Sequence, residues 1–138
     1  MAHVILVDDE PMVLSALSSL ITLETSHAAV VFSQATDALA YLADGRPADV
    51  IISDILMPEM DGLTFLSKAR VLRPEVPRMI LSGYAERTAA LAGAGRAGAF
   101  IFLEKPWDNN VLLDNIRTAI KLPETLIAGT GMQRNAFA

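Results

Sequence analysis

The sequence contains no cysteine. That absence excludes disulfide bonds, thiolate metal sites and cysteine nucleophiles, and it is compatible with a reducing compartment. Basic residues are also scarce, because 11 Lys and Arg stand against 16 Asp and Glu and leave a net charge of −5. An acidic chain is poorly suited to binding a phosphate backbone, so we expect no direct contact with nucleic acid.

Long hydrophobic runs are missing as well. No apolar stretch reaches the ~20 residues that cross a bilayer, and the N-terminal segment lacks the basic flank of a signal peptide. We therefore expect a cytoplasmic protein with no membrane partner. What the chain does contain is 52% hydrophobic residues within 138 residues, enough to form the core of one globular domain.

Short apolar runs alternate along the chain with segments of helical periodicity. The runs predict five strands, at Val4–Val7, Ala29–Phe32, Val50–Ser53, Met79–Leu81 and Phe100–Leu103. Between and after them, apolar side chains recur at helical spacing in residues 12–21, 38–42, 63–72 and 112–120. Continuous apolar strands that alternate with helices are typical of a parallel sheet covered on both faces, so the sequence predicts a three-layer α/β sandwich.

Residues at the ends of these segments agree with the predicted helices. Pro11 suits a first helical turn, Ser33 and Asp108 suit N-caps, and Gly45 suits the position after a helix end.

Two regions are weakly specified. A fourth helix at Glu86–Arg96 contains Gly93 and Gly95, each of which costs a helix interior ~1 kcal/mol relative to alanine. It is therefore expected to be short or frayed. After Pro123 the periodicity lapses, so we expect a domain over residues 1–122 and a tail or the start of a linker over 123–138.

Polar residues follow the predicted strands at their carboxyl ends. Asp8 and Asp9 follow the first strand, Asp54 the third, Ser82 the fourth and Lys105 the fifth. Ligands of open parallel sheets bind outside the carboxyl ends of the strands, so we expect these side chains to converge at one edge. Each residue alone has a commoner explanation as a turn, a cap or a surface charge, and only their joint placement favours a functional site.

The chemistry of this set points to phosphoryl transfer. Carboxylates that lie close together repel one another unless a cation is present, and oxygen ligands without His or Cys favour Mg²⁺. A carboxylate beside such an ion can act as a nucleophile. Lys105 and Ser82 can then stabilise the oxygens of a phosphoryl group on an aspartate.

The chain resembles the receiver domains of two-component response regulators over roughly residues 3–121. The resemblance is carried by four segments, Ile5–Glu10, Asp54–Gly62, Leu81–Gly83 and Lys105–Trp107. It implies the flavodoxin-like receiver fold, with five parallel strands in the order 2-1-3-4-5.

The same resemblance implies roles for the residues at the predicted site. Asp54 accepts a phosphoryl group from a sensor histidine kinase. Asp9, Asp54 and the main-chain carbonyl of Leu56 bind Mg²⁺ directly, whereas Asp8 acts through a coordinated water. Lys105 pairs with the phosphoryl group.

Further positions match the parts of a receiver that respond to phosphorylation. Ser82 and Phe102 correspond to the switch pair, and Leu56 and Tyr84 to positions that modulate phosphate lifetime. Trp107 is either a structural lid or part of an interface. In receivers the surface of the fourth helix, fifth strand and fifth helix commonly mediates homodimerisation or contact with an output domain or partner protein.

We therefore predict a phosphoacceptor signalling module rather than an enzyme with turnover. One alternative is a phosphorylation-independent interaction module. A less favoured one is a Mg²⁺-dependent aspartyl-phosphate phosphatase, which usually separates two acids after the first strand and carries a capping insertion. Here Asp8 and Asp9 are adjacent and no long insertion is present.

Overall fold

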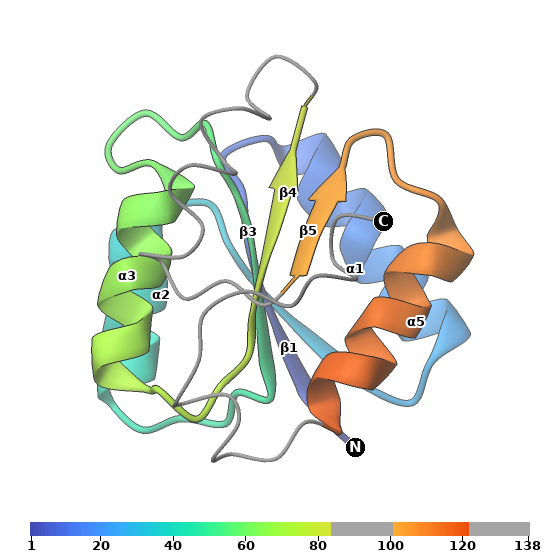
Figure 1. Cartoon of the computed structure of the whole chain (residues 1–138), viewed down its shortest axis with the longest axis horizontal. Coiled ribbons are helices and arrows are strands. Elements are labelled where there is room, and N and C mark those ends of the chain that lie inside the picture. The colour runs from blue at the N-terminus through green and yellow to red at the C-terminus, as the bar shows by residue number, and fades with distance from the viewer. Residues whose placement is uncertain (84–100, 122–138) are drawn as a thin grey trace.

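A five-stranded parallel sheet forms the centre of the computed structural model, which describes residues 1–83 and 101–121. The strands are β1 (His3–Val7), β2 (Ala28–Phe32), β3 (Val50–Asp54), β4 (Arg78–Ser82) and β5 (Ile101–Glu104), in the order β2-β1-β3-β4-β5. The helices are α1 (Pro11–Glu24), α2 (Ala35–Ala43), α3 (Gly62–Leu72) and α5 (Asn109–Ile120). Helices α1 and α5 lie on one side of the sheet, and α2 and α3 on the other (Figure 1). The predicted three-layer architecture and strand order are confirmed.

Burial along the strands explains the continuous apolar runs. Every residue of β3 and β4 is buried, as are four of the five residues of β1. Strands covered on both faces show this pattern. Strand β2 differs, since its residues are half-buried or exposed at the end of the sheet.

The first four predicted strands are shorter than the observed ones by one residue at one or both ends, and the fifth has the observed length but is predicted one residue too early. Asp54 and Ser82 are the last residues of β3 and β4 rather than the residues that follow them. β5 runs from Ile101 to Glu104. Phe100, the predicted fourth helix and the 123–138 tail lie outside the described residues.

Helix starts agree with the sequence at two of three predicted positions. Pro11 opens α1, and the Asp108 carboxylate accepts hydrogen bonds from two amides in the first turn of α5. The prediction for Ser33 is wrong, because α2 begins at Ala35 and its N-cap is Gln34, whose side chain forms no cap bond within the described part of the chain. The chain leaves β2 at Phe32 and uses both intervening residues to reach the helix layer.

Two glycines shape the loops. Gly45 follows the C-cap of α2 with a φ of 72°, the left-handed conformation that glycine adopts at low cost. Gly62 opens α3 directly beneath the end of β3, where an added Cβ would lie 1.9 Å from the carbonyl oxygen of Asp54. The Gly62 amide also donates to the Ile55 carbonyl at 2.8 Å. The loop between β3 and α3 can therefore fold back tightly against the strand end that carries Asp54.

Candidate phosphoacceptor and metal site

Three of the predicted site residues contact one another at the carboxyl ends of the strands. The Lys105 ammonium nitrogen lies 2.9 Å from Oδ1 of Asp54 and 3.4 Å from Oδ2 of Asp8. Asp8 follows β1, Asp54 ends β3 and Lys105 follows β5, so the sheet brings together residues that are far apart in the sequence. Both carboxylates are buried, and Lys105 is partly buried.

The electrostatics of this triad leave negative charge uncompensated. Burial raises the pKa of Asp8, and the nearby charge of Asp54 adds to that effect; the Glu10 amide and Lys105 oppose it without cancelling it. Burial alone lowers the pKa of Lys105. However, hydrogen bonds to Asp54 and Asp8 and their charges outweigh burial, so the pKa of Lys105 is raised. One ammonium group thus neutralises only part of the negative charge of two buried carboxylates, so a further cation at this site would be stabilised.

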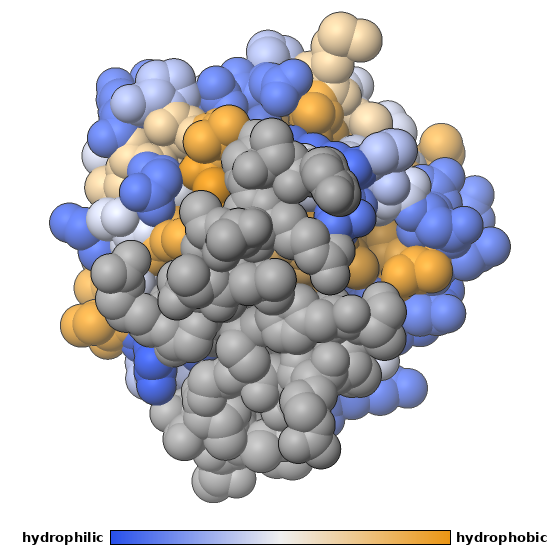
Figure 2. Space-filling model, turned by 45° about the horizontal axis from the view of Figure 1, so that its top comes forward, coloured by the Kyte–Doolittle hydropathy of each residue, from blue (hydrophilic) through white to orange (hydrophobic). Residues whose placement is uncertain are grey.

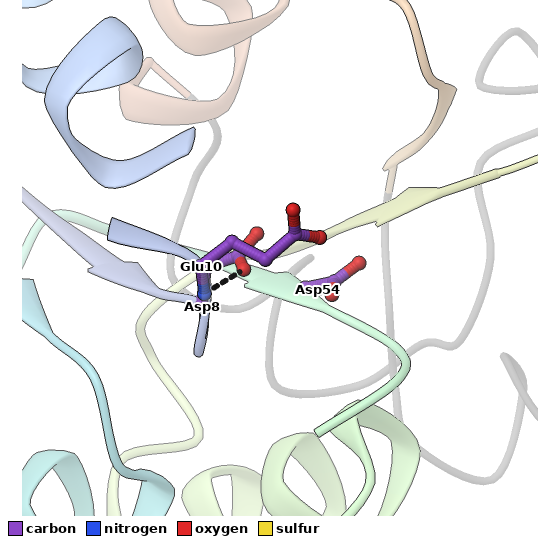
Figure 3. Close-up of side chains that lie close together, drawn as sticks. All are labelled: Asp8, Glu10 and Asp54. Atoms are coloured by element: carbon purple, nitrogen blue, oxygen red, sulfur yellow. Dashed lines mark hydrogen bonds between the residues drawn. The ribbon is translucent and has the colours of Figure 1, made fainter. Parts of the chain in front are cut away.

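A third carboxylate, Glu10, joins the site. Carboxylate oxygens of Asp8, Glu10 and Asp54 lie within 4.8 Å of one another. The Glu10 amide donates to Oδ1 of Asp8 at 2.9 Å, and the Glu10 side chain extends over the site beside Asp54 (Figure 3). Although Glu10 is the N-cap of α1, its side chain does not cap the helix, which leaves the carboxylate available to the site.

Sequence reasoning assigned no role to Glu10. Glu10 is the third of three adjacent acidic residues, Asp8–Glu10, and this was the only sequence feature that could have pointed to it. A run of adjacent acids, however, does not indicate which side chains point toward the site. That direction depends on how the chain passes from β1 into α1.

Asp9, in contrast, lies outside this carboxylate cluster. It is half-buried and lines a pocket of about 320 Å³ together with residues 33–35 and 57–60. The pocket lies between the loops that follow β1, β2 and β3. Asp9 is therefore close to the site, on the side that faces the β2–α2 loop.

The donor set of the cluster fits Mg²⁺. Its ligand atoms are all carboxylate oxygens, the type that a hard divalent cation prefers, and an exposed Glu10 leaves one side open to water. A dication would also relieve the repulsion that one lysine leaves uncompensated.

The predicted switch pair lies in the interior. Ser82 is fully buried, and its hydroxyl donates to the Gly83 carbonyl at 3.0 Å. Phe102 is 3% exposed and packs in the core on β5, beside β4. The main chain ties the two regions together, because the Lys105 amide donates to the Ser82 carbonyl at 2.7 Å.

The remaining predicted positions lie around the site. Leu56, two residues after Asp54, is 59% exposed. Trp107 packs against the core, and its indole N–H donates to Oδ1 of Asn109 at 3.1 Å. Tyr84 lies outside the described residues.

Comparison with protein families gives a match to the response regulator receiver domain over residues 4–117. The hydrogenase transcriptional regulatory protein HoxA of Cupriavidus necator is 35% identical over 120 residues, covering 87% of this chain and 24% of HoxA. The response regulator protein TmoT of Ectopseudomonas mendocina is 40% identical over 119 residues, covering 85% of this chain and 52% of TmoT. The chain spans about a quarter to a half of the length of these curated relatives.

Solved structures agree with this similarity. A signal receiver domain of an HD domain-containing protein from Pseudomonas fluorescens Pf-5 superposes with a TM-score of 0.80 at 29% identity, covering 87% of each chain. A response regulator receiver domain protein from Clostridium thermocellum gives a TM-score of 0.79 at 26% identity, covering 87% of this chain and 94% of that one.

Proposed function

Because this chain belongs to the response regulator receiver domain family, we propose that Asp54 is its phosphoacceptor, in a Mg²⁺-dependent reaction that changes the protein surface. The observation that carries this proposal is the convergence of Asp54, Asp8 and Lys105 at one sheet edge, with 2.9 Å between Lys105 and Asp54. Asp54 stands at the end of a fully buried strand, and its carboxylate forms part of the acidic cluster. A nucleophile held beside an ammonium group and a cation site suits phosphoryl transfer.

The chemical step requires a phosphoryl donor. Receiver domains of response regulators interact with histidine kinases and output domains. A carboxylate oxygen of Asp54 would attack the phosphorus of a phosphohistidine, forming the O–P bond as the P–N bond breaks and the imidazole leaves. Lys105 is placed to donate to a phosphoryl oxygen in this step, as the resemblance implies.

Bound Mg²⁺ would supply positive charge to the phosphoryl oxygens. The cluster geometry nominates Asp8, Glu10 and Asp54 to hold it, and the resemblance adds Asp9 and the main-chain carbonyl of Leu56. The domain would promote transfer onto itself and later hydrolysis, and it would not turn over a separate substrate.

The kinase would approach the edge that carries the site. Three side chains that begin or follow elements at this edge are apolar and exposed: Met12 at 85%, Leu56 at 59% and Val111 at 48%. Hydrophobic and hydrophilic groups lie side by side on the face seen in Figure 2. Exposed apolar groups around a charged centre suit a protein partner.

Phosphorylation would be transmitted through Ser82 and Phe102. The Ser82 hydroxyl would exchange its bond to the Gly83 carbonyl for one to the phosphoryl group, and Phe102 would repack against the space left behind. Phosphate would thus bias one of two packings. As the resemblance implies, the readout surface would include β5 and α5 together with the predicted fourth helix, in contact with an output domain, a partner protein or a second copy.

The direct test is incubation of the chain with acetyl phosphate and Mg²⁺, followed by intact-mass measurement. We expect wild type to gain the mass of one phosphoryl group and Asp54→Ala to gain none. Asp114→Asn, which removes an exposed carboxylate on α5, serves as the matched control and should be phosphorylated like wild type. An equal adduct on Asp54→Ala would contradict the assignment of the acceptor.

The same experiment separates the alternatives. A phosphorylation-independent interaction module would give no adduct on any variant. A phosphatase would instead release product from para-nitrophenyl phosphate over many turnovers.

A further inference from the structure

Strand β2 ends the sheet, and no described strand pairs with its outer edge. Its inner edge is fully engaged with β1. The Ala28 amide donates to a carbonyl just before β1 at 2.9 Å, and the Phe32 carbonyl accepts from the amide that follows β1 at 3.2 Å. In a parallel pair, alternate residues direct both their N–H and their C=O toward the same neighbour. Since Ala28 and Phe32 face β1, the backbone groups of Ala29 and Val31 face outward.

This outer edge lacks the features that usually prevent strand pairing. Residues 25–36 contain no Lys, Arg, Asp or Glu, no proline and no glycine, whereas exposed edges are commonly protected by lysine, proline or bulges. Val31 is also 46% exposed. Within residues 1–83 and 101–121, no strand pairs with these outward donors and acceptors, and an accessible apolar side chain lies beside them.

On the face of the sheet that α1 covers, the surface beside this edge is equally free of charge. Helix α1, which packs on β2, has no charged residue between Pro11 and Leu23. Two copies of a chain with net charge −5 repel in general, but neither the strand edge nor the adjoining part of α1 adds a like charge to this contact. The acidic residue in the first turn of α2, which packs on the other face of the sheet, is Asp37. Interface cores are depleted of charged residues in the same way.

We propose that the outer edge of β2 pairs with the same edge of a second copy, in an antiparallel arrangement about a twofold axis. A second copy fits because identical strands paired in this way are self-complementary. With the two five-residue strands fully overlapped, Ala29 of one copy faces Val31 of the other, and each pair exchanges its outward N–H and C=O groups. The two sheets become one continuous sheet. Because the pairing uses neither Asp54 nor the cation site, it does not depend on phosphorylation.

The test measures association of the unphosphorylated full chain by sedimentation velocity between about 10 µM and about 1 mM, the range in which a small interface associates. We expect a concentration-dependent dimer. Val31→Pro removes an outward N–H without removing a bond to β1, a substitution that edge strands tolerate. Val31→Lys places like charges across the twofold axis. Each variant should raise the dimer dissociation constant by at least about tenfold, which corresponds to ~1.4 kcal/mol.

Amide exchange gives a readout specific to strand pairing. As wild-type concentration rises, the amides of Ala29 and Val31 should become protected, whereas the Val30 amide, bonded toward β1, should be protected at every concentration. Val71→Lys on α3, where the valine is 82% exposed, is the control and should leave association unchanged, whereas Val111→Lys reports on a contact through α5. Circular dichroism verifies folding, and Val31→Lys retains the test if the proline variant unfolds.

Three results would overturn the proposal. The first is a wild-type monomer over the whole range. The second is a dimer whose dissociation constant neither Val31 variant changes, and the third is a dimer in which the Ala29 and Val31 amides stay unprotected. A dimer weakened only by Val111→Lys would place the contact on the face formed with α5 instead.

Discussion

At the residue scale, the main feature of the site is that one lysine lies among three carboxylates. Lys105 contacts both Asp8 and Asp54, and Glu10 adds a third carboxylate from the exposed side. The raised pKa of Asp8 has burial as its main cause, which means that the charged form of this group is poorly solvated. A bound cation would therefore be stabilised because it relieves the repulsion between carboxylates that the fold already holds close together.

The contribution of Glu10 can be separated from that of Asp9. Glu10→Gln should weaken Mg²⁺ binding about fivefold, because an exposed charge about 4 Å from a cation is worth ~1 kcal/mol or more. Asp9→Asn should weaken binding at least about tenfold if the ligand set implied by the resemblance holds. Trp107 is the only tryptophan and lies two residues from Lys105, so its fluorescence during Mg²⁺ titration provides the measurement.

Asp114→Asn is the control for a general change in charge. Unchanged affinity in Glu10→Gln would remove Glu10 from the ligand set. If Asp9→Asn alone had no effect, the carboxylates gathered in the structure, rather than those implied by the resemblance, would define the site.

At the scale of elements, the loop from β3 to α3 holds Asp54 in place through Gly62. A Gly62→Ala side chain would collide with the Asp54 main chain, since the added Cβ would lie 1.9 Å from that carbonyl. We expect a loss of about 2 to 3 kcal/mol in the free energy of unfolding, the scale of overpacking in a rigid setting. The rate of phosphorylation by acetyl phosphate should fall as well.

Gly45→Ala is the matched control. Gly45 has a φ of 72°, and no atom lies within 4 Å of the point that an alanine Cβ would occupy, so alanine should cost ~1 kcal/mol through conformation alone. Its phosphorylation rate should equal that of wild type. Equal effects of the two substitutions on that rate would show that close contact at Gly62 does not position Asp54.

The N-caps of α5 and α2 should contribute differently to the stability of the fold. The Asp108 carboxylate accepts from the amides of Asn110 and Val111, so Asp108→Ala should lower the free energy of unfolding by ~1 kcal/mol. Ser33→Ala should change it by less than ~0.5 kcal/mol, because Gln34 and not Ser33 is the N-cap of α2. Urea titration measures both. A larger loss in Ser33→Ala than in Asp108→Ala would contradict the observed helix starts.

At the scale of the whole molecule, a cation that binds only the folded chain must stabilise it. At a Mg²⁺ concentration of about 100 times the dissociation constant, the gain is ~2.7 kcal/mol, which corresponds to a rise in Tm on the order of 10 °C. Beryllofluoride added with Mg²⁺ should raise Tm further and shift the ring resonances of Phe102. Differential scanning calorimetry and NMR measure the two effects.

Sodium chloride at matched ionic strength controls for screening and should leave Tm nearly unchanged. An equal rise with sodium would show that general screening, not a site, is responsible. Ring resonances of Phe102 that stay in place would remove Phe102 from the switch.

The amino-acid pattern alone predicted the three-layer architecture and the convergence of three of the proposed site residues. Apolar runs alternate with helical segments because buried parallel strands need apolar residues on both faces, and this pattern predicted the three layers. Asp8, Asp54 and Lys105 were identified because parallel strands deliver their carboxyl ends to one edge. The strand order came from the family resemblance, since periodicity carries no information on which strands are neighbours.

Tertiary structure decided what local pattern cannot encode. That Glu10 turns toward Asp54 while Asp9 lines the neighbouring pocket depends on the path of the chain from β1 into α1. The start of α2 at Ala35 depends on the distance from the sheet to the helix layer. The outward backbone groups of β2 follow only from its place at the end of the sheet. In each case the outcome depends on how strands and helices pack against one another, and a local sequence pattern does not specify that packing.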